Sequence, residues 1–158
     1  MTALPLLLNS TVVASEWLRT ITPLVQAGTQ VGQTLPQDNT SWGTSGFVLV
    51  QNIGGNHGLY TPLERPIMQL SAYAVSPNGQ KPLFNLANAI ISHIVKASRE
   101  YEAVDAVMRV LTPTVKGKTY PQARVLTCYP LHEERKVVND LSQAGRYDID
   151  FRFHWTRV

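Results

Sequence analysis

Cysteine is almost missing from this chain: Cys128 is the only one among 158 residues, so no disulfide can form within it. A lone thiol fits a reducing compartment such as the cytosol. Long apolar runs are missing too, since none approaches the roughly 18 residues that a membrane helix needs. We therefore expect no membrane contact. We interpret the leucine-rich run 5–8 as the buried start of the mature chain rather than as a signal peptide.

Charge is also scarce, because only 16% of the residues are charged and the net excess is +3. The basic residues lack the clustering of a dedicated nucleic-acid binder. A hydrophobic content of 44% is typical of soluble globular proteins. The length suits one domain, which we take as residues 1–158.

The last thirteen residues alternate between apolar and polar side chains. Successive side chains of a strand point to opposite faces, so this alternation predicts a strand with one buried face. Truncation of this segment should not be tolerated. The residues that alternate on its apolar face, which we call the apolar parity, are Tyr147, Ile149, Phe151, Phe153 and Trp155.

Apolar spacing predicts helices and strands elsewhere in the chain. The helices are 10–26, with a kink or an end near Pro23, and one from 83 that covers Phe151 and Phe153 and continues, straight or bent, towards 111. The strands are 29–35, 47–53, 65–75 and 122–131. We expect a basic loop at 115–121 and a charged connection with one helical turn at 132–144. This order predicts an α+β fold, a mostly antiparallel sheet packed against two helices.

Three side chains on the polar parity of the terminal segment are candidate metal ligands or acid/base groups: Asp148, Asp150 and His154. Arg152 lies in the same row, and its guanidinium would repel a cation. A solvated strand face with cross-strand ion pairs is therefore the favoured interpretation. A small metal-dependent hydrolase or nuclease stays as a weak alternative. We expect no catalytic residue, metal or cofactor.

Two nucleotide-binding patterns are incomplete. The run 117–119 reads Gly-Lys-Thr, but a phosphate loop would need glycine where Thr112 stands and a helix where Pro121 follows. The tryptophans Trp17, Trp42 and Trp155 are isolated, so they form no stacking platform for single-stranded nucleic acid. A basic single-strand binder is a third class, and it would require tight, salt-sensitive binding.

The pattern of the whole chain resembles the tail terminator (tail completion) proteins of long-tailed bacteriophages. The resemblance covers nearly all of the chain, except about 98–121. The segments that carry it are the Trp17-Leu18 step, GTQVGQTLP at 28–36, FVLVQNIGG at 47–55, a strand from Pro66, a helix at 83 and RYDIDFRF at 146–153.

The resemblance implies a structural protein rather than an enzyme. Members of this family form a homo-hexameric ring that caps the tail tube, stops tube polymerisation and joins the tail to the head connector. Genomic DNA passes through the lumen without specific binding. The expected location is the head-proximal end of the virion tail, after assembly in the host bacterial cytoplasm. A head-side neck or closure protein is the alternative within this class.

A ring-forming subunit needs two different contact patches. We expect the loop at 54–64 to supply an apolar subunit or tube interface, because exposed apolar segments usually mark interfaces. Its residues are Leu59, Tyr60, Pro62 and Leu63. Modest positive charge could face DNA in the lumen, and the candidates are Lys116, Lys118 and Arg124.

Overall fold

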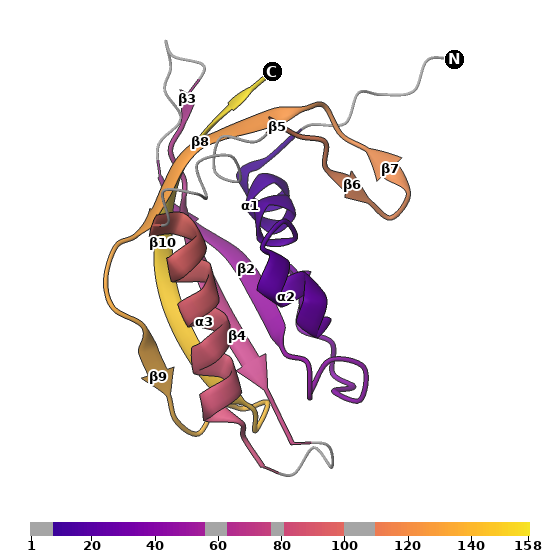
Figure 1. Cartoon of the computed structure of the whole chain (residues 1–158), viewed down its shortest axis with the longest axis vertical. Helices are drawn as coiled ribbons and strands as arrows, with labels where there is room; N and C mark the ends of the chain where they lie inside the picture. Colours follow the sequence, from indigo (N-terminus) through magenta and orange to yellow (C-terminus); the bar gives the residue numbers. More distant parts are fainter. Residues whose placement is uncertain (1–7, 56–62, 77–80, 100–109) are drawn as a thin grey trace.

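The computed structural model describes residues 8–55, 63–76, 81–99 and 110–158. Three helices lie on one face of a large, curled, mostly antiparallel sheet, and a small hairpin extends to one side (Figure 1). The predicted α+β class is confirmed. Among the described residues, no helix combines the length and the apolar character that crossing a bilayer requires.

The helices are α1 (Ser10–Leu18), α2 (Thr22–Ala27) and α3 (Phe84–Arg99). The predicted helix 10–26 is therefore divided, and the sheet packs against three helices rather than two. Pro23 lies in the first turn of α2, where its missing N–H costs nothing. Asn9 caps α1 by accepting a hydrogen bond from the Val12 amide at 2.9 Å.

The large sheet has the order β1-β2-β4-β10-β8-β5, and β3 and β9 also pair with β10. Only the β1–β2 pair is parallel among these pairings. The strands are β1 (Gln30–Gly32), β2 (Phe47–Gly54), β3 (Leu63–Glu64), β4 (Ile67–Ala74), β5 (Val110–Leu111), β6 (Thr114–Val115), β7 (Lys118–Thr119), β8 (Ala123–Pro130), β9 (Arg135–Val137) and β10 (Gly145–Arg157).

The predicted terminal strand is confirmed as β10, the central strand of the sheet. Its apolar parity is buried against the helices at Ile149, Phe151, Phe153 and Trp155. The ring of Trp17 on α1 meets Phe153 edge-on, with centroids 5.5 Å apart. α3 packs over the same face of β10, as predicted for the helix that begins near residue 83.

The opposite side of the sheet, which we call the outer face, is covered only in part. A second apolar cluster forms there around Trp42, Phe47 and Tyr73, because the segment between β1 and β2 folds back over the sheet. Beyond this cluster, Gln51 and Ile53 on β2 and Thr127 and Tyr129 on β8 are exposed.

Three local predictions are wrong. Val110 and Leu111 do not extend a helix but form β5 on the edge of β8, while 100–109 lie outside the described residues. The basic stretch 115–121 is not a plain loop, because β6 and β7 pair as a hairpin around Lys116 and Gly117. The connection 132–144 contains β9 rather than a helical turn, since Arg135–Val137 pairs with an otherwise open part of β10.

Candidate functional site

The hairpin of β6 and β7 borders a groove of about 630 Å³. Lys116 and Lys118 line this groove together with Ser15 of α1, with Arg19 at the C-cap of α1 and with Gln33, which follows β1. Arg19 is partly engaged, because it donates a hydrogen bond to the Val31 carbonyl at 3.0 Å. The two lysines predicted to face DNA thus belong to a groove on the helix side of the sheet that contains three cationic side chains.

Arg124, the third predicted lumen residue, lies on a different surface. Its neighbours Ala123 and Val125 are buried under the helices, so Arg124 points to the outer face. It is paired in register with Thr156 of β10. The predicted lumen residues are therefore divided between two sides of the sheet.

The predicted apolar interface is described only at Leu63. This residue lies in β3, opposite Thr156 of β10, and is half-buried. Leu59, Tyr60 and Pro62 lie outside the described residues.

Asp148 of the candidate metal row is buried in an ion-pair network. Arg146 holds its two carboxylate oxygens at 2.8 and 2.9 Å and reaches Asp140 at 2.8 Å. The guanidinium also lies over the Tyr73 ring. A metal at Asp148 would have to displace this bidentate arginine, so the residue is structural.

The Asp150 carboxylate is hydrogen-bonded to His132, a pairing that the sequence analysis did not predict. The Nε2 atom of His132 lies 2.8 Å from Asp150 Oδ2, and its Nδ1 atom lies 2.6 Å from the Glu133 carbonyl. These two acceptors suit the imidazolium, whose ring nitrogens both donate. The hydrogen bond to the Glu133 carbonyl, followed by the one to Asp150, raises the pKa of His132.

His154 faces cations and an aromatic ring instead of the two carboxylates. The Tyr129 hydroxyl lies 3.4 Å from its Nε2 atom. Burial, and then the positive charges of Arg65 and Arg152, lower the pKa of His154. The predicted row therefore does not converge, and the described ranges contain no group of three metal-ligating His, Cys, Asp or Glu side chains.

Arg65, Arg152, Tyr129 and His154 form a compact group that we call the outer-face cluster. Arg152 donates a hydrogen bond to the Arg65 carbonyl at 2.9 Å, and both line a cavity of about 340 Å³ with Gly55 and Ile67. Arg65 precedes Arg152 by 87 residues, so sequence spacing gave no signal of their proximity. Only the polar parity of β10 pointed to this surface.

Cys128 is buried in the main core, and this burial raises the pKa of its thiol far above the ordinary value. It is therefore unsuited to act as a nucleophile at neutral pH. The three tryptophans are buried as well, which agrees with the expectation that they form no surface platform.

Neither protein-family models nor curated proteins match this sequence. A function therefore has to be inferred from the residues and the geometry described above.

Proposed function

We propose that the chain is a tail terminator of a long-tailed bacteriophage, a subunit of a six-membered ring that caps the tail tube and meets the head connector. One observation carries the proposal. The sequence segments that resemble this family contain β1, β2, β4 and β10, which are consecutive neighbours in the sheet. Segments scattered over the chain thus form one continuous structural unit.

The β6–β7 hairpin supports a role in subunit contacts. Its strands have two residues each and pair with each other rather than with the large sheet. An isolated short hairpin is marginally stable in water, and here Val115 and the adjacent Tyr120 pack against the core. A neighbouring subunit on the hairpin would stabilise it further. The segment with Leu59, Tyr60, Pro62 and Leu63 is our candidate for the second patch.

The three candidate lumen residues lie on two sides of the sheet. Lys116 and Lys118 extend with the hairpin, whereas Arg124 lies on the outer face. Charge reversal of the two lysines and charge reversal of Arg124 should therefore be tested as separate variants in particle assembly. Normal infectious particles from both variants would contradict the assignment of these residues to the lumen.

The decisive experiment is the native mass of the purified protein by light scattering, with electron micrographs of the same fraction. Six copies of the 17.5 kDa chain make about 105 kDa. A ring of this mass with a central hole supports the proposal. If the protein is a monomer, it should be recruited to the ends of added tail tubes. A monomer that does not bind to tube ends contradicts the proposal. If the protein binds to isolated heads instead, this result supports the alternative, a head-side neck protein.

A further inference from the structure

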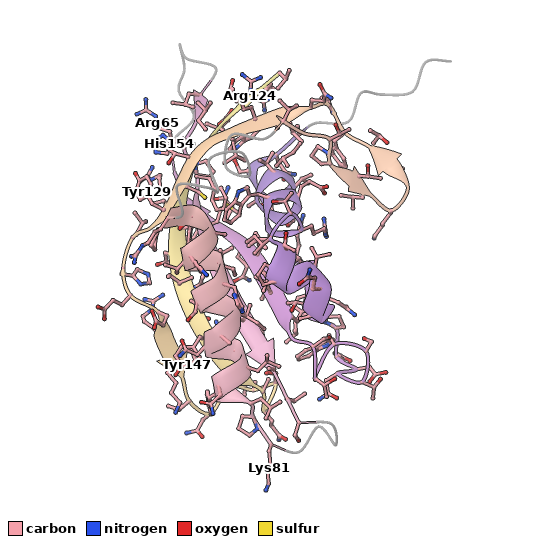
Figure 2. The ribbon with its side chains drawn as sticks, viewed as in Figure 1. Arg65, Lys81, Arg124, Tyr129, Tyr147 and His154 are labelled. Carbon is pink, nitrogen blue, oxygen red and sulfur yellow. The ribbon has the colours of Figure 1, made fainter. Side chains whose placement is uncertain are left out.

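The outer-face cluster lies beyond the cluster around Trp42, on a part of the outer face where the described residues include exposed side chains. Arg152 on β10 has Ile67 of β4 on one side and Tyr129 of β8 on the other, in register. Residues opposite one another in neighbouring strands share a face, so these three side chains form one row. Tyr129 is 42% exposed in this row, and Arg65, which lines a cavity together with Arg152, is exposed as well (Figure 2).

The two arginines of the cluster carry positive charge that the described part of the chain does not neutralise. Among the described residues, neither the Arg65 nor the Arg152 guanidinium forms an ion pair with a carboxylate. The nearest carboxylate on the same strand face, Asp150, already binds His132 and lies 3.6 Å from Arg135. Glu64, which precedes Arg65, pairs with Arg157 at 3.1 Å.

The backbone beneath the cluster is closely packed. Gly55 has φ +104, and a Cβ atom at this position would lie 2.5 Å from the Arg65 carbonyl oxygen. Only glycine allows this close approach, and the same carbonyl accepts the hydrogen bond from Arg152. These contacts bring the backbones of Gly55 and Arg65 and the side chain of Arg152 together at one place on the sheet.

Aromatic surface lies next to this charge. The rings of Tyr129 and His154 are tilted by 34°, with centroids 5.9 Å apart. Sheet surfaces that present aromatic rings beside arginines are suited to stacking unpaired bases while the cations contact phosphates. Arg124, on the same face and opposite Thr156, extends the positive charge along β10.

We propose that the outer-face cluster binds single-stranded nucleic acid, with Arg65 and Arg152 contacting phosphodiester groups and Tyr129 stacking on a base. An acidic peptide could satisfy the arginines but would leave the exposed aromatic ring without a role. A single strand uses both features. The site lies within one subunit, so it does not depend on the proposed ring.

The test measures fluorescence anisotropy of a labelled oligothymidylate of about 10 nucleotides with the full chain, over a series of salt concentrations. Arg65→Gln is the primary variant. The Arg65 guanidinium forms no hydrogen bond or ion pair with the described residues, so the fold should be unaffected. Arg65→Gln with Arg152→Gln should weaken binding at least about tenfold and lower the salt slope by about 1.4. Tyr129→Leu should weaken binding between about fivefold and 150-fold, and more than Tyr129→Phe, which can still stack.

Lys81→Gln is the matched control, since it removes the same charge from an exposed position at the other end of the molecule (Figure 2). Thermal melts should show that each variant is folded. NMR titration of His154 gives a second readout, because a bound phosphodiester should raise the pKa of this residue.

Four results would overturn the proposal. The first is unchanged oligonucleotide binding in the folded arginine variants, and the second is an equal loss in Lys81→Gln, which would indicate diffuse charge attraction. The third is equal competition by polyglutamate of matched charge, which would identify an acidic-peptide site. If inorganic phosphate shifts His154 but the oligonucleotide does not bind, the site takes a free anion and the nucleic-acid proposal fails.

Discussion

The indole nitrogen of Trp155 donates a hydrogen bond to the hydroxyl of Ser10 at 2.9 Å, across 145 residues of sequence. Trp155 is buried near the end of β10, and Ser10 is the first residue of α1. Close to it, Arg157 donates a hydrogen bond to the Leu8 carbonyl at 3.2 Å. These contacts attach the central strand of the sheet to the helix that covers it.

Replacing Ser10 by alanine should destabilise the fold by about 1 to 3 kcal/mol, because the buried indole N–H would lose its acceptor. Urea denaturation followed by tryptophan fluorescence measures the loss. Ser10→Thr keeps the hydroxyl and is the control. Equal free energies of unfolding in Ser10→Ala and the unmodified chain would show that this hydrogen bond contributes nothing.

Arg146→Met should cost about 3 to 5 kcal/mol, since it leaves the carboxylates of Asp148 and Asp140 without their shared cation. Arg135→Met is the matched control, because Arg135 is exposed and lies 3.6 Å from its partner Asp150. The control should cost no more than about 1 kcal/mol. Chemical denaturation compares the two, and similar losses would contradict a special role for the buried network.

His132 should make stability depend on pH. Its pKa is raised above the ordinary value of 6.5 by the Glu133 carbonyl and by Asp150, so its contribution is fully present below pH 6.5. The contribution is lost as the pH rises through the raised pKa. The difference in unfolding free energy between the unmodified chain and His132→Gln should therefore shrink from acidic to alkaline pH. A difference that stays constant with pH would exclude this linkage.

Gly117→Val should destabilise the β6–β7 hairpin, because Gly117 has φ +78, which a β-branched residue adopts only with strain of about 1 to 3 kcal/mol. Lys116 also has a positive φ, of 51°, which asparagine accepts more readily than lysine. Lys116→Asn is thus a control that removes charge but keeps the turn. Amide hydrogen exchange in β6 and β7 should be faster in Gly117→Val and not in Lys116→Asn. Unchanged exchange in Gly117→Val would contradict the turn assignment.

The elements that the sequence predicted correctly are those in which apolar residues recur at a regular spacing over many residues. β10 alternates over its whole length because one of its faces is buried along nearly all of it, and α3 shows an equally regular stripe at Ile90, Ile91 and Ile94. The short strands β5 and β9 have two and three residues, too few to show any period. These short strands form because the parts of β8 and β10 that are not covered by a longer strand have backbone groups available for hydrogen bonding.

The candidate sites were harder to predict for a related reason. The sequence placed Asp148, Asp150 and His154 on one face, which is correct, but their partners come from other segments. His132 precedes Asp150 by 18 residues, and Tyr129 precedes His154 by 25. Only the register between β8 and β10 brings these groups together, and one alternating pattern cannot specify that register.

The position of β10 in the sheet also determines when the fold can form. β10 pairs with β3, β4, β8 and β9, all of which are synthesised before it. Until residues 145–157 leave the ribosome, β4 and β8 have no central partner, and the apolar surfaces of Met68, Leu70 and Val125 stay without cover from β10. Completion of the sheet should therefore wait for residues 145–157 and be slow for a domain of this size, because most of its pairings are long-range. During that interval the nascent chain is a substrate for chaperones and vulnerable to aggregation.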